Sequence, residues 1–271
     1  MNYLKRGFKY TFKAIRKNKS IFILLLILQI IMMFSLALSS VNYQVKIFKD
    51  LEKIVGPLEN ANYDAESIKA GEPFMENVYE IYTSYKSMIK NVSEFGLLLL
   101  GLFLILNGAS WVLTHQLLKT KIKEMPRQWL KYIVSTLALI IPFIGICYLL
   151  IKGLTAIGIG LESFGLVAQI LVYSSFVLYY FIIVAFAFID YKSWKTFLKN
   201  FYLCSIKKIY LTLIILLINL ILVIASSYFI YLNLSDESFP LMMLFSLILV
   251  IILVITRIYW VVCLRLISHK K

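Results

Sequence analysis

The feature of this sequence that most restricts its fold is a series of six long apolar runs separated by charged segments. A helix needs about 20 mainly apolar residues to cross the roughly 30 Å hydrocarbon core of a bilayer. Each run is long enough, and the runs cover residues 21–41, 95–115, 129–151, 164–189, 209–232 and 239–262. The sequence is 61% hydrophobic, well above the roughly 45–50% of a soluble domain. We therefore predict an all-α fold, a polytopic transmembrane helical bundle of about six spans, as a single membrane domain over residues 1–271.

The distribution of basic residues predicts which side of the membrane each connection occupies. About three quarters of the 28 Lys and Arg residues fall in alternate segments, namely residues 1–20, 115–131, 190–208 and the C-terminal end from Arg257. The intervening segments contain most of the 14 acidic residues. Lys and Arg collect on the cytoplasmic side of membrane proteins. Both termini are therefore expected in the cytoplasm, and the net charge of +14 requires no nucleic-acid partner to explain it.

Basic amphipathic segments are predicted at three cytoplasmic positions, namely residues 1–20, residues 190–208 and the connection between the second and third runs, which is shorter and is broken at Pro126. In residues 1–20, apolar side chains recur every three or four positions and Lys and Arg occupy the adjoining faces. A similar stripe begins at Trp194, where Asp190 is expected to cap the helix. Basic helices with aromatic faces lie well on an anionic membrane, although orienting the spans would alone account for these charges. The candidates for contact with lipid or a partner are Phe8, Phe12, Lys13, Arg16, Trp194, Phe197 and Lys199.

The one long connection, residues 42–94, is predicted to be an external acidic segment. Acidic residues outnumber lysines in it, and Pro57, Gly71 and Pro73 interrupt it. From Phe74 onward its apolar residues have helical spacing, so we expect a helix there that continues into the second span. The segment is too short for an independent enzyme domain, and we expect it to cap the bundle.

Residues that carry catalytic or metal chemistry are sparse. The two histidines are His115 and His269, both at predicted cytoplasmic ends, and His115 is expected to be an interfacial residue. The sequence has no HExxH, GxSxG or glycine-rich phosphate loop. Cys147, Cys204 and Cys263 have no partner at CxxC or zinc-ligand spacing. We therefore predict no catalytic residues, no cofactor and no metal.

Polar residues inside the predicted spans are interpreted as helix-packing positions, with a substrate site as the alternative. Small and amide side chains allow neighbouring helices to approach closely and to hydrogen-bond across the interface. The helix-packing candidates are Asn107, Gly108, Ser110 and Asn219. Arg257 is the one charged exception within the runs and lies near the end of the sixth, beside Tyr259 and Trp260, so we expect its long side chain to extend to the membrane interface.

The connection after the fourth run carries a resemblance to a known family. The run ends in Phe-Ile-Asp at residues 188–190, an amphipathic stretch follows at residues 193–200, and Lys-Lys at 207–208 precedes the next long run. This arrangement, together with the basic start and the connection at residues 119–123, resembles the poorly characterised prokaryotic six-span proteins related to the membrane domain of some glycerophosphodiester phosphodiesterases. Two departures are Asn200, where a Ser is usual, and the separation of Pro142 from Gly145. The resemblance implies a multi-pass fold in a prokaryotic cell membrane, without the phosphodiesterase domain itself.

A looser resemblance links the chain to the six-span permease subunits of ABC-type exporters. Those subunits also begin with a basic amphipathic helix and often carry an external segment after the first span, but their acidic-Gly-Thr pattern is missing from Lys119–Arg127. The leading hypothesis is a non-enzymatic protein that engages membrane lipids or other membrane proteins through its basic amphipathic segments. The alternative is an export permease that works with a separate ATPase subunit.

Overall fold

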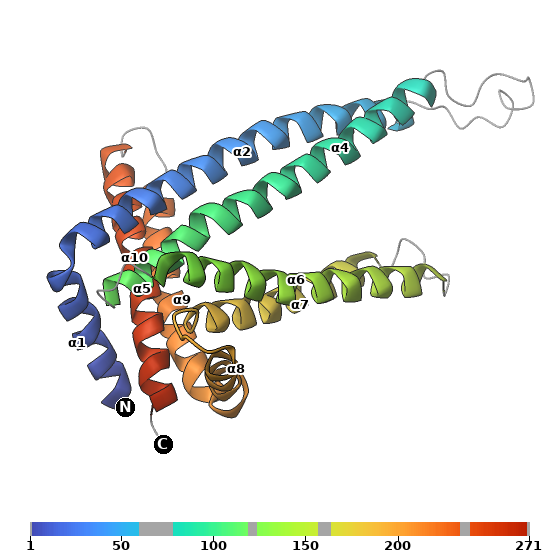
Figure 1. Cartoon of the computed structure of the whole chain (residues 1–271). Helices are drawn as coiled ribbons and strands as arrows, with labels where there is room; N and C mark the ends of the chain where they lie inside the picture. The colour runs from blue at the N-terminus through green and yellow to red at the C-terminus, as the bar shows by residue number, and fades with distance from the viewer. Residues whose placement is uncertain (1, 60–77, 119–123, 157–163, 234–238, 270–271) are drawn as a thin grey trace, which may run out of the picture. The chain divides into compact units, whose positions relative to one another are not determined.

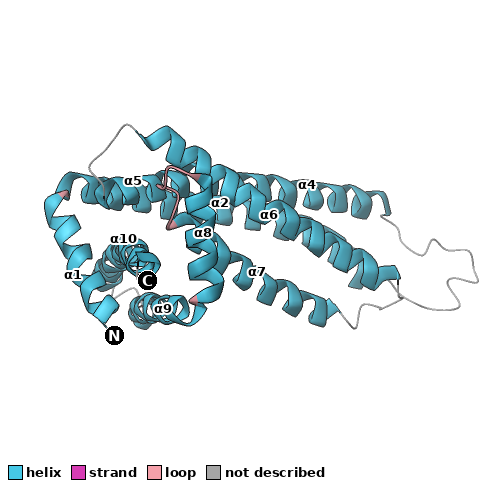
Figure 2. Ribbon diagram, turned by 60° about the horizontal axis from the view of Figure 1, so that its bottom comes forward, coloured by secondary structure: helices cyan, strands magenta, loops and turns pink. Residues whose placement is uncertain are grey.

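The computed structural model describes residues 2–59, 78–118, 124–156, 164–233 and 239–269. Within these ranges the chain is helical, with short turns and no strand (Figures 1 and 2). Six of the helices are long and apolar enough to cross a membrane. The all-α prediction is therefore confirmed, and residues 60–77 of the predicted external segment lie outside the described ranges.

The chain divides into two compact units. A smaller unit comprises residues 30–107, and a larger unit comprises residues 1–29 and 108–271. The helix α2 (Lys19–Glu59) contributes its start to the larger unit and the rest to the smaller one.

The smaller unit is an antiparallel helical hairpin. It pairs the later part of α2 with α4 (Val78–Leu102), which continues into a π-helix, η1 (Phe103–Asn107). Tyr43 stacks on Phe95 with ring centroids 5.3 Å apart, and farther along Asn91 Nδ2 donates to Asp50 Oδ2 over 2.8 Å. The contacts fix the register of the hairpin.

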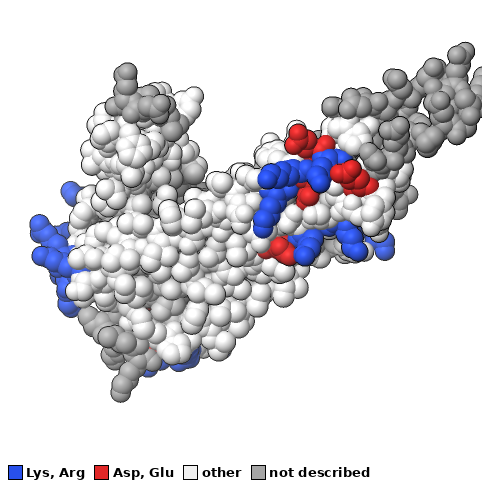
Figure 3. All heavy atoms as spheres, turned by 90° about the horizontal axis from the view of Figure 1, so that it is seen from above, with Lys and Arg blue, Asp and Glu red and all other residues white. Residues whose placement is uncertain are grey.

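The first part of the predicted external segment is helical, because the helix of the first span continues beyond the end of the predicted apolar run at Val41. The helix α2 continues to Glu59 and is 41 residues long, or about 60 Å at 1.5 Å per residue. The hairpin has an uncharged half at residues 30–45 and 95–107, while its charged residues lie between 46 and 94. Figure 3 shows the Lys, Asp and Glu side chains of the described part of this range gathered together on the hairpin. Its charged half is therefore suited to water and its uncharged half to lipid.

The larger unit contains the remaining helices. These are α1 (Asn2–Lys17), α5 (Gly108–Leu118), α6 (Met125–Ala156), α7 (Phe164–Phe186), α8 (Trp194–Tyr202), a π-helix η4 (Leu203–Lys207), α9 (Ile209–Leu232) and α10 (Phe239–His269). A buried apolar cluster joins α2, α5 and α10 through Leu25, Leu117 and Ile258. The predicted fifth span, 209–232, matches α9. The helices α6 and α10 extend beyond their predicted spans.

The helix α7 ends at Phe186, three residues before the predicted end of the fourth span. Backbone bonds from Ala187 N to Val184 O and from Phe188 N to Ala185 O have i to i−3 spacing, so the chain tightens into turns at this point. Ser193, rather than the predicted Asp190, caps the next helix, because its side chain accepts from Lys195 N over 3.2 Å. Asp190 makes a tertiary contact instead of capping the helix.

Close approach of helices depends on two glycines of the larger unit. A Cβ at Gly108 would lie 2.8 Å from Trp129 Nε1 and 2.9 Å from the Tyr132 ring, so the α5–α6 contact requires glycine at this position. A Cβ at Gly7 would collide with Cys263 Sγ, so α1 lies directly against α10. These contacts hold α5 against α6 and α1 against α10.

Candidate functional site

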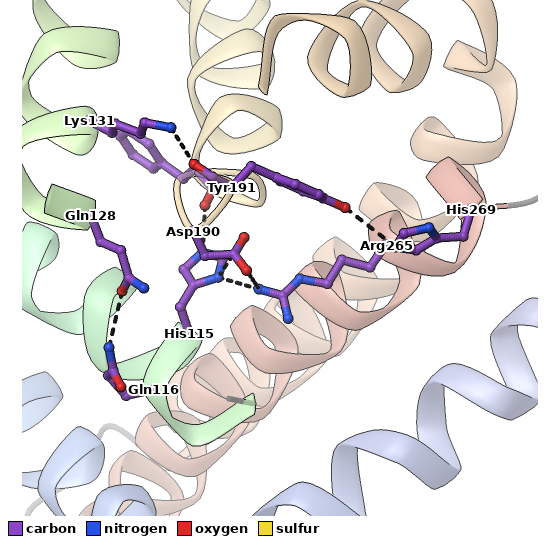
Figure 4. Close-up of polar contacts among 9 residues, drawn as sticks. His115, Gln116, Gln128, Lys131, Asp190, Tyr191, Arg265 and His269 are labelled. Atoms are coloured by element: carbon purple, nitrogen blue, oxygen red, sulfur yellow. Dashed lines mark hydrogen bonds and ion pairs between the residues drawn. The ribbon is translucent and has the colours of Figure 1, made fainter. Parts of the chain in front are cut away.

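A buried ionic cluster joins three segments of the larger unit where their helices end (Figure 4). Asp190 lies in the turns after α7, Arg265 in the C-terminal part of α10, and His115 on α5. Arg265 Nη2 is 2.9 Å from Asp190 Oδ2 and 2.5 Å from His115 Nδ1. The side chains of Asp190 and His115 are 1% and 0% exposed, and that of Arg265 is 16% exposed. The cluster is therefore almost completely removed from solvent.

The partners of His115 define its tautomer. Its Nε2 lies 2.8 Å from the carbonyl oxygen of Phe186, which can only accept, so Nε2 carries the proton. Its Nδ1 faces the guanidinium of Arg265, which can only donate, so Nδ1 is the acceptor. The imidazole is thus neutral and both of its nitrogens are engaged. The structure buries this residue, which corrects the expectation of an interfacial histidine.

This arrangement is suited to holding helices together rather than to proton transfer. A general base needs a nitrogen or oxygen within reach of a substrate proton, and both nitrogens of His115 are occupied by protein groups. The Arg265 charge compensates the Asp190 charge within a water-excluded environment. Removing one member of a buried pair costs about 3–5 kcal/mol, because it leaves the other charge uncompensated. The cluster therefore connects α5, α10 and the turns after α7.

Side chains of α6 hold the same turns from another direction. Lys131 Nζ donates to the carbonyl oxygens of Tyr191 and Lys192, and Arg127 Nη2 donates to that of Lys192. Lys131 Nζ also lies 5.1 Å from the centroid of the Trp194 ring at the start of α8. The position of α8 is thereby tied to the ionic cluster through the turns that precede it.

Further polar contacts extend from the cluster in both directions. Gln116 Nε2 donates to Gln128 Oε1 over 3.3 Å and joins α5 to α6. On the other side, the Tyr191 hydroxyl lies 3.5 Å from His269 Nε2 (Figure 4), and burial raises the pKa of Tyr191.

Burial also raises the pKa of the Cys204 thiol to about 12, so this cysteine is protonated at neutral pH and is a poor nucleophile.

The sequence-based candidates for lipid or partner contact occupy different environments. Phe8 and Phe12 are exposed and touch each other, with ring centroids 4.6 Å apart. Trp194 is partly exposed, whereas Phe197 is 3% exposed and therefore unavailable to lipid. The basic candidates Lys13, Arg16 and Lys199 are exposed.

The helix-packing candidates also separate into distinct roles. Gly108 permits the close α5–α6 contact described above, and Ser110 is completely buried beside it in the sequence. Asn219 Nδ2 donates to Thr256 O over 3.3 Å and so joins α9 to α10. Asn107 is the last residue of η1 in the smaller unit.

None of these candidates belongs to the ionic cluster, which sequence reasoning missed. One signal was present: Asp190 is an isolated acid among lysines in a predicted cytoplasmic segment. The two partners of Asp190 lie far from it in the sequence, His115 before it and Arg265 after it, and they are 150 residues apart from each other.

The described part of the chain contains no group of three His, Cys, Asp or Glu residues placed to hold a metal ion. Comparison of the chain with protein-family models, with curated proteins and with solved structures finds no match.

Proposed function

We propose that this chain is a non-enzymatic, multi-pass protein of the cell membrane, with both termini in the cytoplasm, that engages anionic lipid through α1 and α8. The observation that carries the proposal is the exposed Phe8–Phe12 pair beside a strongly basic helix face. The six long apolar helices support the multi-pass assignment, and the concentration of Lys and Arg in alternate connections supports the orientation.

The helix α1 has three faces with different chemistry. One face, with Gly7 and Thr11, is buried, and Gly7 lies against α10. The next face presents Phe8 and Phe12, which are adjacent because residues four apart lie on the same side of a helix. The third carries the exposed Lys and Arg side chains. A helix fixed to the protein along one side can thus place two rings in the acyl region and its cations among the headgroups.

The helix α8 offers a second surface of the same kind. Its exposed apolar residues, Trp194, Leu198 and Tyr202, recur every four positions and form one stripe. Lys195 and Lys199 are also exposed. Phe197 packs inward, so the helix is fixed to the protein while the stripe remains available. The ionic cluster contributes by fixing the turns that lead into α8.

The energies involved are sufficient for a stable membrane contact. Full burial of one phenylalanine ring contributes about 1.5–3 kcal/mol, and each Lys or Arg near an anionic surface contributes about 1 kcal/mol. Two rings and several cations on α1 therefore supply several kcal/mol, and most of the electrostatic part requires anionic lipid.

Hydrogen exchange in lipid nanodiscs tests the proposal. The full chain is reconstituted in phosphatidylcholine alone or with one third phosphatidylglycerol, and exchange is followed in α1. We expect stronger protection with the anionic lipid, and weaker protection in both lipids for a Phe8→Ser/Phe12→Ser variant, because the buried area of the two rings is lost. Tyr10→Ser is the matched control, because it removes an exposed aromatic ring from the same helix. Equal exchange in both lipids would reject the proposal, and co-purification of a nucleotide-hydrolysing subunit from native membranes would favour the export-permease alternative.

A further inference from the structure

Arg257 is the sole charged residue in the apolar run 239–262, and its environment differs from our expectation of a side chain extended to the interface. Its Nη2 donates to Gln29 Oε1 over 2.8 Å, and its Cζ lies 5.7 Å from the centroid of the Trp111 ring. The guanidinium is therefore directed into the larger unit, towards α2 and α5. Ionisable residues that face a bundle interior in this way frequently mark ligand sites.

The charge of Arg257 has no acidic partner among the described residues. Its contacts are a neutral amide and an aromatic ring, and its Nη1 is buried with no hydrogen-bond acceptor in the described part of the chain. The buried acid Asp190 of the larger unit pairs with Arg265 instead. A buried guanidinium is costly when its charge has no counter-charge and one of its nitrogens has no acceptor, and a bound anion would supply both.

Two tyrosines of neighbouring helices, Tyr179 and Tyr132, interact electrostatically with the guanidinium of Arg257. Tyr179 on α7 is 56% exposed. The surroundings of Arg257 therefore reach the surface of the larger unit at α7. The unpaired Nη1 of the guanidinium and a tyrosine hydroxyl are both donors of the kind that bind phosphate oxygens.

The position of Arg257 along α10 favours a lipid source for that phosphate. It lies five residues before Val262, which is about 8 Å along the helix from the end of the apolar run. A phospholipid headgroup at the end of the apolar run therefore lies about one and a half helical turns from the level of Arg257. We propose that Arg257, assisted by Tyr179, binds the phosphate group of an anionic phospholipid at a discrete site. This site is separate from the surfaces of α1 and α8 and does not depend on them.

Binding is tested by native mass spectrometry of the full chain in detergent, with phosphatidylglycerol and phosphatidylcholine as probes. We expect the wild-type protein to retain phosphatidylglycerol at least about tenfold better than Arg257→Gln, with a partial loss in Tyr179→Phe. The matched control is Arg6→Gln, which removes one exposed charge from α1 and should retain the lipid. Equal retention by the wild type and Arg257→Gln overturns the proposal.

Two further measurements keep the test decisive. If Arg257→Gln fails to fold, Arg257→Lys and Tyr179→Phe replace it, and unchanged retention in both overturns the proposal. Inorganic phosphate is added as a competitor: binding of phosphate without phosphatidylglycerol assigns the same site to a free phosphate, whereas lipid retention unaffected by phosphate assigns it to the headgroup. Phe8→Ser/Phe12→Ser should leave this site intact, so its result distinguishes the site from the surface contact of α1.

Discussion

Replacing Asp190 with Asn removes the acidic member of the buried ionic cluster while preserving its shape. Arg265 would then remain beside the neutral His115 with no counter-charge, although its side chain is 16% exposed. Complete burial would give a loss of about 3–5 kcal/mol. Because water can partly solvate Arg265, we expect Asp190→Asn to reduce the free energy of unfolding by about 2–3 kcal/mol.

A double-mutant cycle isolates the pair from other effects of the substitution. Arg265→Met should cost a similar amount, because Asp190 is then buried alone. The double variant should be less destabilised than the sum of the two single variants, by about 1.5–3 kcal/mol. Unfolding is followed by tryptophan fluorescence in mixed detergent micelles, where the wild type and all variants are compared at the same detergent composition.

The control for this cycle is an exposed ion pair in the smaller unit. Lys53 Nζ lies 3.7 Å from Glu80 Oε1, and both side chains are more than half exposed. Exposed pairs typically contribute less than about 1 kcal/mol, so a cycle on this pair should show little coupling. If the Asp190–Arg265 cycle is additive within about 0.5 kcal/mol, the cluster does not connect the helices as we infer.

Three further predictions concern packing, thiol reactivity and topology. Gly108→Ala should lower the thermal midpoint, because its Cβ would collide with two aromatic rings of α6, whereas Gly101→Ala meets open space and should be neutral or stabilising by up to about 1 kcal/mol. A maleimide should modify the buried Cys204 much more slowly in the native protein than after unfolding in denaturing detergent, and equal rates in the two states would contradict the burial. A membrane-impermeant reagent applied to intact cells should reach an engineered cysteine at Asn233 and neither terminus; labelling of the termini alone would reverse the orientation.

Hydropathy and charge determined much of this protein before any tertiary contact was considered. Crossing a bilayer requires local hydrophobicity over about 20 residues, so the spans can be read from consecutive positions. The same is true of α1, whose periodicity depends on neighbours three and four residues apart. Helix ends were less predictable: α2 continues to Glu59, because sequence polarity there marks exit from the apolar layer rather than the end of the helix.

The ionic cluster was decided by tertiary structure alone. His115, Asp190 and Arg265 come from three segments. No local sequence pattern predicts which carboxylate forms an ion pair with a given guanidinium. The direction of Arg257 and the burial of Phe197 likewise depend on which neighbours surround each helix face. Hydrophobicity is a property of one segment, whereas the partner of a buried charge is a property of the helices that exclude water around it.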